Sequence, residues 1–171
     1  IHNFNSFNEA KHKVQIDVLF ICAHFVLILE VKNITGRIDF DDRCRQLVRT
    51  RLNGEQESFM NPVDQVKRHH QYIEHVFLSS SAFIPVESAV VIANPNTLIG
   101  RVSNEVPIFN VSGLRTFIEG LCKKYSHVRL NARKIYQHLK SLCVEERFDL
   151  SADDYEIRRG VLCLGCGGVM H

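Results

Sequence analysis

The sequence has no long apolar run, no strong net charge and no repeated or low-complexity segment. Its longest apolar stretch is interrupted by His24 and Glu30, so it falls short of the roughly 18 residues that a membrane span needs. The formal net charge of +2 is too small to indicate nucleic-acid binding, so any basic surface has to be local. We therefore expect a globular protein without a membrane partner. Because no secretory signal is visible, we expect it in the cytoplasm.

The cysteine pattern does not suggest a disulfide framework. Four of the six cysteines are scattered through apolar or amphipathic stretches, where free thiols are commoner than bridges in a cytosolic protein. We interpret Cys22, Cys44, Cys122 and Cys143 as structural residues.

Hydrophobic periodicity predicts strands that alternate with helices. Two β-rich segments separated by Cys22-Ala23-His24 are typical of an antiparallel hairpin, and Asn61-Pro62 is a strong helix start. The expected strands span residues 14–21, 25–32, 37–40, 46–52, 86–93 and 107–111, and the expected helices begin at Asn61, at Ser112 (113–125) and at Asn131. This order indicates an α/β fold.

Charged residues stand where the second strand of the hairpin should be buried. Glu30 and Lys32 are two apart and therefore project from the same face. If the hairpin loop has an even number of residues, Cys22 pairs with Phe25 and Asp17 pairs with Glu30. An odd loop places Asp17 on the opposite face.

Two facing carboxylates repel each other unless a cation lies between them. Oxygen ligands suit Mg²⁺, and Lys32 beside them can neutralise charge on phosphorus or position the attacking water. These are the groups that phosphodiester hydrolysis requires. The alternative is a solvated strand edge, because short charged motifs also occur without function.

The motifs QID (15–17), LEVKN followed by Gly36, and Asn61-Pro62 with Gln65 resemble the nuclease-related domain (NERD) family. Through it the chain resembles the restriction-endonuclease-like PD-(D/E)XK nucleases. The resemblance covers residues 14–93 and implies a central mixed β-sheet flanked by helices.

The same resemblance implies the roles of individual residues. Asp17, Glu30 and the backbone carbonyl of Val31 become ligands of Mg²⁺ or Mn²⁺, Lys32 becomes catalytic, and Gln65 becomes a site residue. Such nucleases often carry a further acidic residue on a helix before the first strand. Here Glu9 alone precedes Asp17, in a polar, loop-like segment, so the sequence departs from the pattern at this point.

Basic residues outline a possible DNA path. Arg43, Arg45, Arg49 and Arg51 share strand parity, and Lys67 and Arg68 follow Gln65 on the predicted helix. Non-specific binding to phosphates requires only such a patch. A solvated charged face is the alternative.

The C-terminal Cys163-Leu-Gly-Cys166 is half of a four-ligand zinc site, and His171 adds a third possible ligand. A redox role is less favoured because no strand-to-helix context surrounds the pair. By resemblance, a topoisomerase-type zinc ribbon starts here and is completed in a longer chain. We thus expect a nuclease-like domain over 1–144, a linker over 145–160 and an incomplete zinc ribbon over 161–171.

The main hypothesis is a Mg²⁺-dependent nuclease that acts on DNA. The alternatives are an inactive DNA-binding or protein-interaction module of the same fold, and a nucleotide-processing phosphatase or regulatory domain with the same metal chemistry. The sequence does not choose between endo- and exonuclease action, nor does it indicate an oligomeric state.

Overall fold

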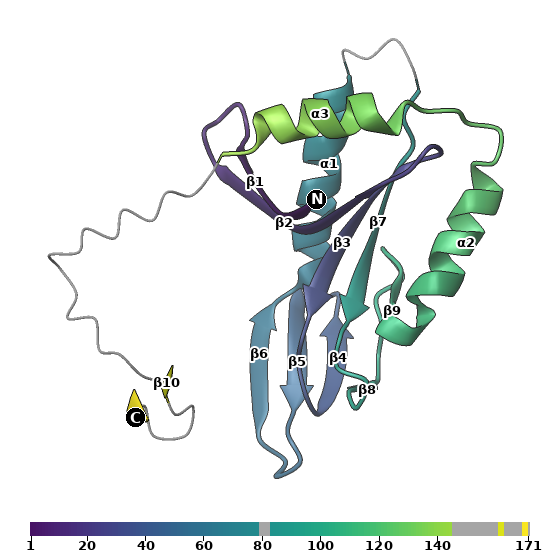
Figure 1. Ribbon diagram of the computed structural model, residues 1–171. Coiled ribbons are helices and arrows are strands. Elements are labelled where there is room, and N and C mark those ends of the chain that lie inside the picture. Colours follow the sequence, from purple (N-terminus) through teal and green to yellow (C-terminus); the bar gives the residue numbers. More distant parts are fainter. Residues whose placement is uncertain (79–82, 145–160, 163–168, 171) are drawn as a thin grey trace, which may run out of the picture.

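The computed structural model describes residues 1–78, 83–144, 161–162 and 169–170. They form an α/β fold with two mixed sheets flanked by helices (Figure 1), which confirms the predicted fold class. Two short strands, β10 (Val161–Leu162) and β11 (Val169–Met170), pair with each other in antiparallel orientation.

The first sheet has the strand order β1-β2-β3-β7-β9. Its strands are β1 (His2–Phe7), β2 (Lys13–Ile21), β3 (Val26–Lys32), β7 (Val86–Ile92) and β9 (Ile108–Asn110). The first three are antiparallel neighbours, whereas β7 runs parallel to both β3 and β9. The strands at the centre of the sheet are nearly continuous apolar runs because helices cover both of their faces.

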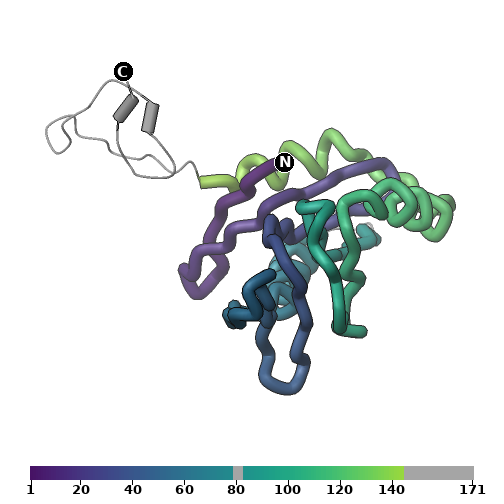
Figure 2. Tube along the Cα trace, turned by 90° about the horizontal axis from the view of Figure 1, so that it is seen from below, coloured from purple at the N-terminus to yellow at the C-terminus, as the bar shows by residue number. Residues whose placement is uncertain are grey.

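The second sheet has the order β6-β5-β4-β8 and extends away from the first (Figure 2). It consists of β4 (Arg37–Asp41), β5 (Gln46–Thr50), β6 (Gln56–Met60) and the short β8 (Leu98–Ile99). The sequence predicted β4 and β5 but not β6, nor β1 in the first sheet. Strand β6 is mostly exposed, so it lacks the apolar alternation by which a half-buried strand is identified.

Within the described residues, three α-helices complete the fold: α1 (Pro62–Phe77), α2 (Leu114–Lys124) and α3 (Ala132–Leu142). Asn61 caps α1 as predicted, because its side chain accepts a hydrogen bond of 3.0 Å from the amide of Val63. Ser112 does not cap α2, contrary to the prediction. It lies in a 3₁₀ turn, η1 (Val111–Gly113), which Asn110 caps.

The helices divide the core into two apolar clusters. The larger one includes Ile28, Val66 and Leu139, and so joins β3 to α1 and α3. The second includes Leu27, Leu29 and Leu121, and joins the opposite face of β3 to α2. Among the described residues, no helix is long and apolar enough to cross a membrane.

Candidate active site

The β2–β3 hairpin has the register that brings the predicted carboxylates together. Val18 pairs with Leu29 and Ile21 with Val26, and the amide of Cys22 donates to the carbonyl of Phe25 at 3.1 Å. The loop is therefore even, as the proposed site requires. Continued by one residue, this register sets Asp17 opposite Glu30.

The regular alternation of side chains between the two faces of the sheet is interrupted in β2 near Asp17. Ile16 and Leu19 both belong to the larger core cluster although they are three residues apart, so the alternation of faces is interrupted between them. The backbone pairing of β2 with β3 ends at Val18. Beyond it, the Asp17 carboxylate takes the place of a backbone partner and accepts a hydrogen bond of 2.8 Å from the amide of Val31.

Glu30 is the buried charge of the site, with only 1% of the residue exposed. Its Oε1 accepts a hydrogen bond of 2.5 Å from Nζ of Lys32, and the same Nζ donates to Oε1 of Gln65 at 3.3 Å. Burial raises the pKa of the Glu30 carboxyl, although the hydrogen bond from Lys32 opposes the shift. The structure thus brings together Asp17, Glu30, Lys32 and Gln65, which the sequence had placed on three separate elements.

A fifth residue, His69, was not predicted as part of this site. It lies one helical turn after Gln65 on α1, with its Nδ1 3.9 Å from Oε2 of Glu30. Burial lowers the pKa of His69 from 6.5 to about 4, and the nearby positive charge of Arg68 acts in the same direction. The i, i+4 spacing from Gln65 is the sequence signal that could have identified it.

This buried imidazole has a consequence for stability. Between pH 6.5 and about 4 the unfolded chain binds a proton at His69 and the folded chain does not, so stability falls as the pH is lowered. We expect the free energy of unfolding to fall by about 2 kcal/mol between pH 7.5 and 5 because of this residue. Urea denaturation of the wild type and of His69→Gln at both pH values measures it. Glu30 is present in both proteins, so equal pH dependence in the two would contradict the assignment.

The residues present fit a divalent cation. Oε2 of Glu30 is buried and lacks a hydrogen-bond partner among the described residues, so one carboxylate oxygen remains available. A hollow of about 380 Å³ between His2, Asn3, Asp17, Val18 and Val31 gives solvent access next to Asp17. In the described residues no three His, Cys, Asp or Glu side chains cluster as a metal site. The carboxylates of Asp17 and Glu30 are oxygen donors of the kind that Mg²⁺ prefers, and this ion usually keeps several waters as its remaining ligands.

The basic residues are arranged differently from the prediction. Arg43 and Arg45 do not share strand parity with Arg49, because they lie in the turn between β4 and β5. The Asp41 side chain accepts hydrogen bonds of 2.9 Å from the amides of Arg43 and Cys44, and these bonds stabilise the turn. The parity argument fails there because a local side-chain hydrogen bond replaces the strand.

Several of these cations are already paired. Arg45 contacts Asp64 and, at 2.5 Å, Glu105, which also binds Lys67 at 2.6 Å. This network ties the β4–β5 turn to the start of α1. Arg49 and Arg51 share the carboxylate of Glu57, whereas Arg68 is exposed on α1.

The four cysteines interpreted as structural are free thiols. Three are half-buried, but Cys44 is exposed in the β4–β5 turn, so a packing role for it is wrong. Cys163, Cys166 and His171 lie outside the described residues, as does the expected linker over 145–160.

The comparisons with known proteins bear on this region of the chain. A family model described as the nuclease-related domain, NERD, matches residues 1–93. That range contains Asp17, Glu30, Lys32, Gln65 and His69. Neither a curated protein nor a solved structure gave a match.

Proposed function

The chain belongs to the nuclease-related domain (NERD) family, and on this premise we propose that it is a metal-dependent nuclease that hydrolyses DNA phosphodiester bonds during DNA processing. We assign its active site to the PD-(D/E)XK type. The observation that carries the proposal is the convergence of Asp17, Glu30, Lys32 and Gln65, with a buried oxygen of Glu30 left unpartnered.

In this proposal Asp17, Glu30 and the Val31 carbonyl hold Mg²⁺ or Mn²⁺. Such an ion polarises the phosphodiester and lowers the pKa of an attacking water. Lys32 supplies positive charge to the oxygens on phosphorus or orients the water. Gln65 accepts a hydrogen bond from Nζ of Lys32 and so fixes the direction of that side chain. His69 is neutral at physiological pH because its pKa is lowered to about 4, and its Nδ1 lies 3.9 Å from Oε2 of Glu30.

The metal requirement is tested by removing the metal. We expect cleavage of plasmid and single-stranded DNA with Mg²⁺ or Mn²⁺, and loss of cleavage after chelation, because two carboxylates without a cation repel a phosphodiester. Gel assays with EDTA and with restored Mg²⁺ measure this. Cleavage that persists in the chelator would contradict the metal mechanism. Binding without any cleavage would favour the inactive DNA-binding module instead.

The proposed DNA path consists of Arg43, Arg45, Arg49, Arg51, Lys67 and Arg68. Arg49 and Arg51 are its best-placed members, because both pair with the single carboxylate of Glu57. Their two guanidinium groups together offer more hydrogen-bond donors than this carboxylate can accept.

Replacing Arg49 and Arg51 together with alanine should weaken DNA binding across all sequences. Loss of two phosphate contacts should lower the slope of log K against log salt by about 1 to 2. Fluorescence anisotropy over a salt series measures the slope, with Arg115→Ala as the control, since Arg115 is highly exposed on α2 and pairs with Glu119. A slope that the double change leaves intact would place the path elsewhere.

We further propose the domain organisation expected from the sequence, with zinc bound by Cys163 and Cys166 in a longer chain. Four protein ligands normally close a structural zinc site. This assignment stays a prediction because both cysteines lie outside the described residues.

A further inference from the structure

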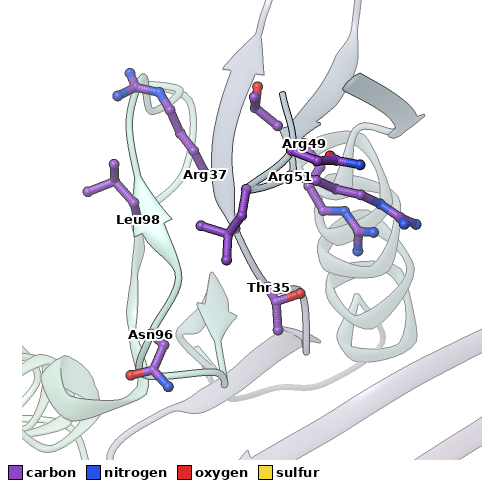
Figure 3. A pocket seen from close by; sticks show the side chains of 10 residues that line it. Thr35, Arg37, Arg49, Arg51, Asn96 and Leu98 are labelled. Atoms are coloured by element: carbon purple, nitrogen blue, oxygen red, sulfur yellow. The ribbon is translucent and has the colours of Figure 1, made fainter. Parts of the chain in front are cut away.

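A second hollow, of about 900 Å³, lies where the strands of the candidate active site end. We call it the arginine hollow. The residues of its lining that matter here are Gly36, Arg49, Arg51, Leu52, Asn96 and Leu98. Figure 3 shows Arg49 and Arg51 together on one side of it, and Leu98 and Asn96 on the other.

The arginine hollow is close to the active site along the chain. Lys32 ends β3 and pairs with Ile92 at the end of β7, and the two segments that follow stay together, since the amide of Leu98 donates to the carbonyl of Gly36 at 3.0 Å. Gly36 is the fourth residue after Lys32, so their Cα atoms are at most about 14 Å apart. One DNA strand can therefore cross from one site to the other.

The lining combines cationic donors with exposed apolar side chains. Arg49 and Arg51 both pair with the single carboxylate of Glu57, and the Arg51 side chain is 47% exposed, so this wall retains excess positive charge. Leu52 is fully exposed and Leu98 is 58% exposed. Large apolar side chains left open beside arginines match a ligand that has both phosphates and flat apolar faces.

The shape of the hollow selects between forms of DNA. In a duplex the faces of the bases are stacked against each other and cannot contact leucine side chains. A volume of about 900 Å³ accommodates a ligand of small-molecule size, such as a few nucleotides, rather than a whole double helix. Only an unpaired strand presents phosphates and base faces to it at once.

From these observations we infer that the arginine hollow binds a single, unpaired DNA strand next to the scissile bond. The inference rests on the proposed function and narrows its substrate to single-stranded DNA or to strands released from a duplex. The arginines contact the phosphates, and Leu52 and Leu98 contact the bases.

The test measures binding of an oligothymidylate of about 12 nucleotides, a length typical of single-strand sites, and of a blunt duplex of equal length. Lys32→Ala is the background, so that the DNA is not cut. We expect the single strand to bind at least about tenfold more tightly than the duplex. The charge-neutral double change Leu52→Ala and Leu98→Ala should reduce this affinity about tenfold, as expected when the partial burial of apolar side chains is lost. It should leave duplex binding unchanged.

Leu78→Ala is the matched control, since Leu78 is an exposed leucine at the end of α1 and outside the hollow. Equal affinity for single strand and duplex would overturn the inference, as would an unchanged preference in the double variant. Either result leaves the proposed function intact if the wild type still cuts DNA with Mg²⁺. Absence of both DNA binding and DNA cleavage would refute the inference together with the proposed function. Polyglutamate serves as an acidic peptide probe, and tighter binding of it than of DNA would also overturn the inference.

Discussion

Replacing Lys32 with alanine is expected to reduce Mg²⁺-dependent DNA cleavage by at least about 100-fold, the usual cost of removing one positioned donor from a transition state. Nζ of Lys32 is the cation that the structure places against Glu30, at 2.5 Å, and Gln65 holds it from the other side. The loss should appear in the rate of cleavage and much less in the affinity for DNA, because distal cations supply most of the binding.

The control for this change is Lys123→Ala. Lys123 is exposed in the last turn of α2, which packs on the face of β3 opposite to Glu30. The Lys123→Ala change removes the same charge from the protein without altering a residue of the candidate active site. Circular dichroism checks that both variants fold. Equal cleavage by the wild type and Lys32→Ala would remove the catalytic role of Lys32.

Gly36→Ala is expected to destabilise the protein far more than the corresponding change at Gly54. Both glycines have positive φ, +93° and +86°, so both substitutions carry backbone strain of about 1 kcal/mol or more. At Gly36 an added Cβ would also lie 2.6 Å from the carbonyl oxygen of Thr50, whereas nothing lies within 4 Å at Gly54.

The clash should add about 1 to 3 kcal/mol to the cost at Gly36 alone. Urea denaturation of the two variants measures the difference in the free energy of unfolding, and Gly54→Ala serves as the strain-matched control. This explains physically why a glycine follows the Glu-Val-Lys segment: the turn must pass against the backbone of β5. Equal destabilisation at the two positions would show that this close approach is not maintained in solution.

The sequence predicted the centre of the site because the pattern there is governed by local rules. Apolar alternation and the short loop at Ala23-His24 determine the hairpin register from Val18 to Ile21, and this register brings Asp17 beside the Glu30–Val31 segment. The helix start at Asn61 then orients Gln65. The even hairpin loop, with the register from Val18 to Ile21, and this helix start were confirmed.

What the sequence did not predict depends on tertiary contacts. His69 lies in a run of basic and histidine residues that suggests a solvated face, and only the packing of α1 on β3 buries it beside Glu30. Arg45 was grouped with Arg49 and Arg51 by strand parity, but its positive φ of 54° and its contacts with Asp64 and Glu105 belong to a turn. Ion pairs between distant segments leave no periodic signal in a sequence.

The most direct test of the central claim is anomalous diffraction from crystals of the protein soaked in Mn²⁺. The account predicts a manganese peak bound by the carboxylates of Asp17 and Glu30 and the carbonyl of Val31, at the distances of about 2.0 to 2.3 Å that small hard cations make with oxygen. The peak should be absent from Glu30→Gln. Active protein with no manganese at this position, or with the ion bound equally well after the Glu30 change, would contradict the account.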